Sequence, residues 1–257
     1  MVELMRNIFI FAILITIIAT TATAVAWILN PPDKYGTALN FQNIQTPTAI
    51  SSETNPLSPN ASSSPFLPPA LPDAMNTEVP FTSQAPFGIW DYIHEEACEE
   101  ASITMVYAWS RGLALTPTLA DQEIHKQILW EEENQIDPLN TSATTTAAMA
   151  QALYGLSLRI LTEPNIKELQ KELTDGNIIT LGVSNFDNAY FRGQVPYHMV
   201  VLRGYDETGF FVNDPGTRYG KNYHYSYEYI MDRAHDWGGS LDTLEQTPAI
   251  AVVFEKL

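Results

Sequence analysis

Hydrophobic residues follow three different patterns along the chain, and the changes between these patterns divide it into three zones. Residues 7–29 are uncharged and almost continuously apolar, a run long enough to cross the hydrocarbon core of a bilayer as a helix. Residues 31–78 show no apolar periodicity and are rich in Pro, Ser and Thr. Residues 79–257 show helical and strand periodicities. We therefore predict one folded domain over 79–257, preceded by an N-terminal segment, residues 1–30, and a linker.

The periodicity of the folded zone predicts helices first and mainly strands afterwards. The expected helices are 95–111, 118–133, 145–154, 165–173 and 226–235, and the expected strands are 158–161, 177–183, 197–205, 210–213 and 249–254. Asn165 is the expected N-cap of the fourth helix, and residues 206–209 form a hairpin turn. Helices that precede an antiparallel sheet indicate the α+β class.

The N-terminal segment, residues 1–30, admits two interpretations. Residues 22–24, Ala-Thr-Ala, fit the small-residue cleavage site of a signal peptide. A retained membrane anchor would instead continue through Trp27, a residue type favoured at the membrane interface. Both interpretations place the rest of the chain outside the cytoplasm, with residues 31–78 as an extended, disordered tether. We expect an extracytoplasmic protein that is membrane-anchored, or secreted if the segment is cleaved.

The charge balance and the single cysteine exclude several classes of function. The chain has 13 basic and 30 acidic residues, a formal net charge of −17 and a pI near 4.5. Such a chain repels the phosphates of nucleic acids, so we expect no nucleic-acid partner. Cys98 is the only cysteine, so neither an intramolecular disulfide nor an all-thiolate metal site can form. We expect no cofactor and no metal, and nothing in the sequence indicates an oligomeric state.

Cys98 is the first candidate for chemistry, because it falls in the first turn of the helix expected over 95–111. The free N–H groups and partial positive charge of a helix N-terminus favour a thiolate. Four glutamates oppose this ionisation, and a cationic partner would have to outweigh them: Glu95, Glu96, Glu99 and Glu100. We take these as acids favoured in a first turn rather than as cation ligands. The alternative interpretation of Cys98 is a small core residue.

His198 and Asp214 are candidates for the base and its partner. His198 stands near the start of one expected strand and Asp214 ends the next, so a hairpin would bring them to the same edge. A carboxylate there can orient an imidazole toward a thiol. The alternative is that Asp214 belongs only to a turn and His198 is an ordinary polar residue. Gln84, in the loop before the Cys98 helix, is either an oxyanion donor or a surface glutamine.

Taken together, the order Gln84, Cys98, His198, Asp214 resembles that of papain-fold cysteine peptidases. The local strings are similar to the C39-like peptidase family, named after the double-glycine leader peptidases that process bacteriocins. These strings are VPFTSQAP, WDYIHEEACEEAS, PYHMVVLRGYD and FFVNDPGTRYG, and the resemblance spans about residues 79–237. It implies a papain-like α+β fold in which N-terminal helices pack on an antiparallel sheet.

The resemblance also implies a role for each candidate residue. Cys98 matches the nucleophile and His198 the general base. Asp214 matches the residue that orients the base, and Gln84 the oxyanion donor. The implied reaction is cleavage of a peptide or protein substrate through a thioester acyl-enzyme that water resolves. Glu-Glu follows Cys98 here, whereas the best-known members have Gly-Pro, so the substrate preference of the leader peptidases is not carried over.

Two other classes of function remain open at this point. An exported location also suits a cell-wall amidase or transpeptidase with the same Cys-His-Asp residues, in which an amine can replace water as the acyl acceptor. The third class is a catalytically idle module that binds a surface partner. An unreactive Cys98 would favour this last class.

Overall fold

The computed structural model describes residues 70–191 and 194–256 of the chain. The predicted signal or anchor segment and residues 31–69 of the predicted tether lie outside this part. Within the described residues, no helix has both the length and the apolar character needed to cross a membrane. The interpretation of residues 1–30 therefore stays a prediction.

The described part is built on one antiparallel sheet. Six strands follow the order β2-β7-β3-β4-β5-β6, and β1 pairs in addition with the end of β4. The strands are β1 (Met75–Asn76), β2 (Leu158–Thr162), β3 (Ile178–Phe186), β4 (Val195–Tyr205), β5 (Gly209–Asn213), β6 (Tyr223–Ser226) and β7 (Ile250–Phe254). The central strand β4 forms a hairpin with β5, in which Val201 pairs with Asn213.

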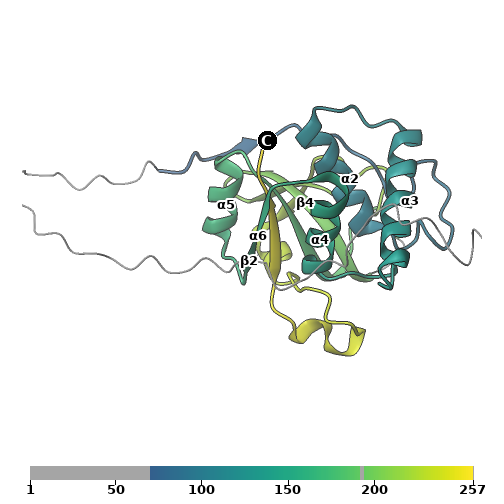
Figure 1. The fold of residues 1–257 in the computed structure, drawn as a ribbon. Coiled ribbons are helices and arrows are strands. Elements are labelled where there is room, and N and C mark those ends of the chain that lie inside the picture. The colour runs from purple at the N-terminus through teal and green to yellow at the C-terminus, as the bar shows by residue number, and fades with distance from the viewer. Residues whose placement is uncertain (1–69, 192–193, 257) are drawn as a thin grey trace, which may run out of the picture. The chain divides into compact units, whose positions relative to one another are not determined.

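Helices cover both faces of this sheet, as Figure 1 shows. They are α2 (Cys98–Arg111), α3 (Pro117–Glu133), α4 (Ala143–Tyr154), α5 (Ile166–Thr174), α6 (Tyr227–Met231) and the 3-10 helix η2 (Leu241–Gln246). Local sequence explains several of their ends. Helix α2 stops at Gly112, whose φ of 63° is readily adopted by glycine. Helix α5 starts with a capping box between Asn165 and Glu168.

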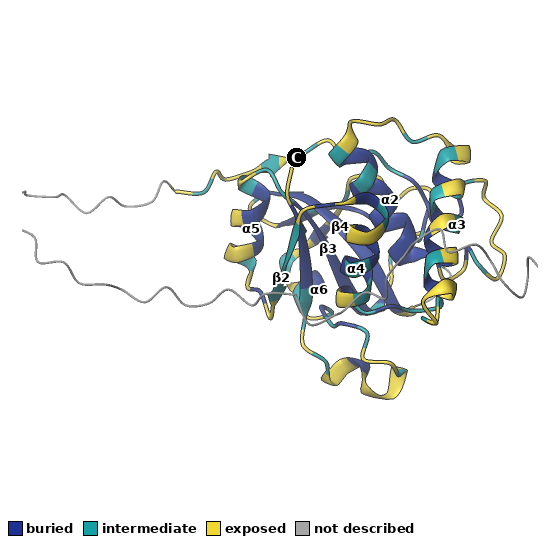
Figure 2. Ribbon diagram, in the orientation of Figure 1, coloured by how far each residue is buried: buried dark blue, intermediate teal, exposed yellow. Residues whose placement is uncertain are grey.

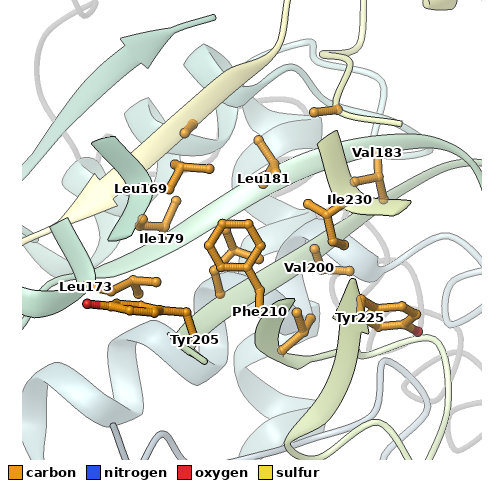
Figure 3. Close-up of a cluster of buried hydrophobic side chains, with 14 of the residues drawn as sticks. Leu169, Leu173, Ile179, Leu181, Val183, Val200, Tyr205, Phe210, Tyr225 and Ile230 are labelled. Carbon is orange, nitrogen blue, oxygen red and sulfur yellow. The ribbon is translucent and has the colours of Figure 1, made fainter. Parts of the chain in front are cut away.

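Alternate residues of the sheet contribute to two hydrophobic cores. Ile179 and Val200 belong to the core covered by α5 and α6, part of which is shown in Figure 3. Their neighbours Ile178 and Val201 point to the other face, where α2 and α4 supply the partners. Helix α3 packs on α2 through a smaller cluster. The central strands β3 and β4 are accordingly buried, while the outer sides of the helices are exposed (Figure 2).

The expected α+β class, with N-terminal helices packed on an antiparallel sheet, is confirmed. The structure differs from the expected elements at two ends. Helix α2 begins at Cys98, because residues 92–97 form turns instead of a helical extension. The helix expected over 226–235 ends at Met231, since Ala234 forms a β-bridge with Val183 and so leaves the helix. Strand β6, which precedes this helix, was not expected.

The sheet also includes residues that the sequence analysis placed in the tether. Met75 and Asn76 form β1 and pair with Tyr205 and Gly204. The two strands approach closely at Gly204, where a Cβ atom would lie 2.3 Å from the Met75 carbonyl oxygen. Glycine therefore permits this pairing. The folded part of the chain begins before residue 79.

Candidate active site

Cys98 is the first residue of α2 and is buried where this helix packs on β4. Its side chain is held close to the strand, and Ser102, one turn later, donates from Oγ to the Met199 carbonyl at 3.3 Å. The N-cap Ala97 provides no side-chain cap. Among the described residues no carbonyl accepts the Cys98 backbone N–H. The N-terminus of α2 therefore offers a free donor next to the thiol.

His198 and Asp214 are joined by a direct hydrogen bond. The pairing of Val201 with Asn213 places His198 on β4 beside Asp214, which directly follows β5. The distance from His198 Nε2 to Asp214 Oδ1 is 2.8 Å, and both side chains are buried. Among the described residues no hydrogen bond engages His198 Nδ1. That nitrogen remains available for proton transfer.

Three further groups hold Asp214. Asn188 Nδ2 and Tyr225 Oη donate to its Oδ2 at 2.7 and 2.8 Å. The Gly216 N–H donates to its Oδ1 at 2.9 Å. Burial acts to raise the pKa of Asp214, but the facing His198 and the hydrogen bonds outweigh it and hold this pKa below its usual value. The carboxylate is therefore ionised and fixed in orientation.

These supporting residues were missed by the sequence analysis. Asn188 lies in a loop 26 residues before Asp214, and Tyr225 lies 11 residues after it on the unexpected strand β6. Only Gly216 could be recognised from the sequence, because it belongs to the Asp-Pro-Gly turn. A Cβ atom on Gly216 would lie 3.0 Å from His198 Cε1, so glycine leaves room for the imidazole.

Gln84 lies on the loop ahead of α2. Its backbone N–H donates to the Pro215 carbonyl at 2.9 Å, which joins this loop to the turn after β5. Its side-chain Nε2 donates to the carbonyls of His94 and Glu95, both at 3.0 Å. Both amide hydrogens are thus engaged, and an oxyanion would have to displace one of these carbonyls. The Cys98 N–H needs no such exchange.

The Cys98 thiol is hydrogen-bonded to Glu99. Sγ donates to Glu99 Oε2 at 2.9 Å, and the Thr141 N–H donates to Glu99 Oε1 at the same distance. Among the described residues no hydrogen bond joins Sγ to the His198 ring. Burial raises the pKa of the Cys98 thiol well above its usual value, and the Glu99 carboxylate adds to this effect. Burial also raises the pKa of Glu99 to about 7, so Glu99 is partly ionised near neutral pH.

Two more carboxyls are buried between α2 and α3. The carboxyls of Glu100 and Glu131 lie within hydrogen-bonding distance of each other, so a proton on one can be shared with the other. Burial and the neighbouring Glu131 raise the pKa of Glu100 well above its usual value. Burial raises the pKa of Glu131 to about 8. Two of the four acids that the sequence analysis placed in a first turn, Glu99 and Glu100, are therefore buried, and burial raises the pKa of both.

One open cavity of about 1480 Å³ is lined by Cys98, His198 and Gln84 together. Its volume exceeds that of most small-molecule pockets, which reach roughly 1,000 Å³. The wall also carries large, exposed aromatic side chains, namely Phe87, Trp90, Tyr190 and Tyr219. The structure thus brings three of the four predicted site residues to one surface. Asp214 lies behind His198, where it contacts the ring.

The match to a protein-family model agrees with the resemblance noted in the sequence. A family model described as the Peptidase C39 like family matches residues 76–239. No curated protein matches the chain. Among solved structures, a crystal structure described as a candidate C39-like peptidase from Bacillus anthracis is similar at 18% identity and a TM-score of 0.46; the match covers 70% of this chain and 95% of that one. Because the family match takes in well over half of the chain and every helix from α2 to α6, the chain belongs to the Peptidase C39 like family.

Proposed function

We propose that this protein is a cysteine peptidase in which Cys98 is the nucleophile, His198 the general base and Asp214 the residue that orients the base. One observation carries the proposal. The hydrogen-bonded His198–Asp214 pair stands on the same cavity as the thiol at the N-terminus of α2. Membership of a peptidase family supports the reaction class.

The proposed reaction consists of two acyl-transfer steps. As the bond from Cys98 Sγ to the substrate carbonyl carbon forms, the thiol proton passes to His198 Nδ1. The imidazolium then protonates the leaving amine while the C–N bond breaks, which leaves a thioester. In the second step His198 takes a proton from water as the water oxygen bonds to the thioester carbonyl carbon. The C–S bond then breaks, the imidazolium returns the proton to Cys98 Sγ, and the peptide leaves with a free carboxyl group. Asp214 stabilises the imidazolium throughout and keeps its own charge.

The negative charge on the substrate oxygen requires a donor at the start of α2. The Cys98 N–H is suited to this role because no carbonyl among the described residues competes for it. Gln84 would join as a second donor after the substrate oxygen replaces the carbonyl of His94 or Glu95 as its acceptor. The second donor of the oxyanion site would therefore become available only when substrate binds.

In this proposal the thiol bonded to Glu99 is the resting state. The reactive state forms when the Cys98 side chain turns from Glu99 toward His198, a change of one side-chain rotamer. An ionised Glu99 favours the resting thiol, since its negative charge opposes a thiolate. A protonated Glu99 removes this opposition.

We further propose that the substrate is an unfolded or extended peptide segment of neutral or basic character. The open cavity accommodates a chain longer than a small molecule, and its aromatic side chains offer apolar contact to substrate side chains. The net charge of −17 disfavours acidic segments. The uncharged segment 7–29 and the Pro-rich residues 31–69 motivate the proposal that the domain acts outside the cytoplasm, tethered to the membrane.

The experiment that tests this function is digestion of a peptide library by the full chain. Wild type and Cys98→Ala are incubated with the library, with and without an added amine such as glycinamide, and the products are identified by mass spectrometry. The proposal expects new peptide termini with wild type only. Amine-capped products in place of free acids would instead indicate a transpeptidase. Equal product patterns for folded wild type and Cys98→Ala would overturn both and favour a binding module.

A further inference from the structure

A second group of reactive side chains lies where the turn before α2 meets α3. His94, Asp121 and His125 each offer one ligand atom, and these atoms all lie within 4.8 Å of one another. Asp121 and His125 are one helical turn apart on α3, and His94 comes from the segment that leads into Cys98. None of the three lines the cavity described above.

The spacing of these atoms fits a bound metal ion. His94 Nε2 lies 3.1 Å from Asp121 Oδ1, and His125 Nδ1 lies 3.7 Å from Asp121 Oδ2. Two ligands bound to a tetrahedral zinc ion at about 2.0–2.2 Å are separated by roughly 3.3 Å. A cation between the three side chains would therefore require only small shifts. His125 would turn from its bond with the Asp121 carbonyl, which is possible because its ring is partly exposed.

Asp91 orients the most deeply buried member of the group. His94 Nδ1 lies 2.7 Å from Asp91 Oδ1, so the Nδ1 proton is held by a carboxylate. With the proton on Nδ1, the lone pair of Nε2 points toward Asp121. A carboxylate behind a histidine is the usual arrangement around a metal ion, because it fixes the tautomer and strengthens the ligand.

The ligand types select the class of metal. Two imidazoles and one carboxylate suit divalent transition ions such as Zn²⁺ and Co²⁺, whereas Ca²⁺ and Mg²⁺ prefer sets made wholly of oxygen. The net charge of −17 also raises the local concentration of cations. We propose that His94, Asp121 and His125 bind one Zn²⁺-class ion, a site that the sequence analysis did not expect.

The position of this site gives it a structural consequence for the active site. The ion would link the turn before α2 to helix α3. The ligand in that turn, His94, lies four residues before the nucleophile Cys98. The His94 and Glu95 carbonyls of the same turn accept the Gln84 amide. Binding of the ion would therefore stiffen the backbone that positions both Gln84 and Cys98. The proposal itself is independent of catalysis.

The test is titration of the full chain with ZnCl₂ by isothermal calorimetry, and with CoCl₂ by visible absorption. A Cys98→Ser background removes the thiol as a competing ligand. His125→Ala and Asp121→Asn are the test variants, both partly exposed positions that leave the core intact. His224→Ala is the matched control, because His224 forms a comparable surface pair with Asp206 elsewhere in the fold.

The expected result is one equivalent of Zn²⁺ or Co²⁺ in the background and in His224→Ala. Bound metal should raise the melting temperature of both. Binding and the shift in melting temperature should be lost in His125→Ala and Asp121→Asn, and neither Mg²⁺ nor Ca²⁺ should replace them. Absence of binding in the background protein, or equal binding in all variants, would overturn the proposal.

Discussion

The Cys98 thiol is hydrogen-bonded to a residue that opposes its ionisation, Glu99. Glu99 accepts its proton in a hydrogen bond and opposes the thiolate by charge. His198 lines the same cavity as Cys98, and its hydrogen bond to Asp214 leaves Nδ1 without a partner among the described residues. In the proposed mechanism, reactivity therefore depends on the movement of the sulfur from Glu99 to His198.

Replacing Glu99 with Gln should increase the reactivity of Cys98. The pKa of Glu99 is about 7, so at pH 8 its charge opposes the thiolate in wild type, and the amide removes that charge. We expect alkylation by iodoacetamide at pH 8 to be several-fold faster in Glu99→Gln, with the difference shrinking below pH 6. The exposed Glu132→Gln serves as control and should react like wild type. Equal rates for Glu99→Gln and wild type at pH 8 would contradict the assigned role of Glu99.

Tyr225 should contribute to the reaction through Asp214. Tyr225→Phe removes one of the hydrogen bonds to Asp214 and leaves those from Asn188 and His198. We expect kcat of this variant to fall by roughly three- to tenfold with KM unchanged, while Asp214→Ala, which frees the imidazole, loses about 10²-fold or more. Steady-state kinetics on a peptide identified in the library measures both. An unchanged kcat of the folded variant, together with a lower melting temperature, would show that Tyr225 serves only stability.

Cys98, His198 and Asp214 were candidates from their places near the ends of predicted elements, and only the resemblance to a family implied a role for each. The side-chain contacts could not be read from the sequence. Tyr225 approaches Asp214 only because β6 pairs with β5, a strand too short to be recognised from its pattern. The contact between Cys98 and Glu99 depends on side-chain direction within the first turn of α2, which periodicity does not determine.

At the scale of elements, α2 is unusual because most of its residues are buried, including acids. It lies between β4 on one side and α3 on the other, so its polar residues cannot all reach solvent. Glu100 and Glu131 meet in the contact between α2 and α3, where a hydrogen bond between the two carboxyls requires that one of them be protonated. The packing of these two helices is therefore sensitive to the protonation of their carboxyls.

The stability of the domain should decrease as pH rises from about 5 to 8. The pKa of Glu131 is about 8 in the folded state and near 4.5 in the unfolded chain, so the folded state binds more protons between these values. Glu131→Gln should flatten this dependence and raise the free energy of unfolding at pH 8 by roughly 1–2 kcal/mol, with little effect at pH 5. Chemical denaturation at both pH values measures the change. A wild-type stability that is constant over this range would contradict the account.

Periodicity predicted most helices and strands because their buried positions recur regularly. It failed for β1 and β6, which are two and four residues long and gain their hydrogen bonds from neighbouring strands. It also extended the last helix beyond Met231, since the bridge of Ala234 to Val183 is a tertiary contact that the local sequence does not contain.

At the scale of the whole molecule, residues upstream of 79 contribute to the folded part. The Thr77 N–H donates to the Arg203 carbonyl at 2.9 Å, and Arg203 Nε donates back to the Thr77 carbonyl at 2.7 Å. Tyr205 Oη donates to the Pro72 carbonyl at 3.0 Å. This segment therefore covers the end of the central strand β4.

Truncation should show where the domain begins. A chain that starts at residue 70 keeps β1 and the hydrogen bonds of Thr77 and Pro72, whereas one that starts at 79 loses them. We expect both to fold, and the shorter one to be less stable by roughly 1–3 kcal/mol because several partly buried hydrogen bonds are removed. Urea denaturation compares them. Equal stability would place the domain boundary at 79.

The central claim is that Cys98 and His198 together transfer an acyl group. The most direct measurement is acylation of the full chain by p-nitrophenyl acetate, followed by release of nitrophenol and by the intact mass of the protein. We predict that wild type gains one acetyl group on Cys98, that Cys98→Ala gains none there, and that His198→Ala reacts at least about 10²-fold more slowly. Acylation of Cys98 at the same rate in folded His198→Ala, or no acylation of folded wild type, would contradict the claim.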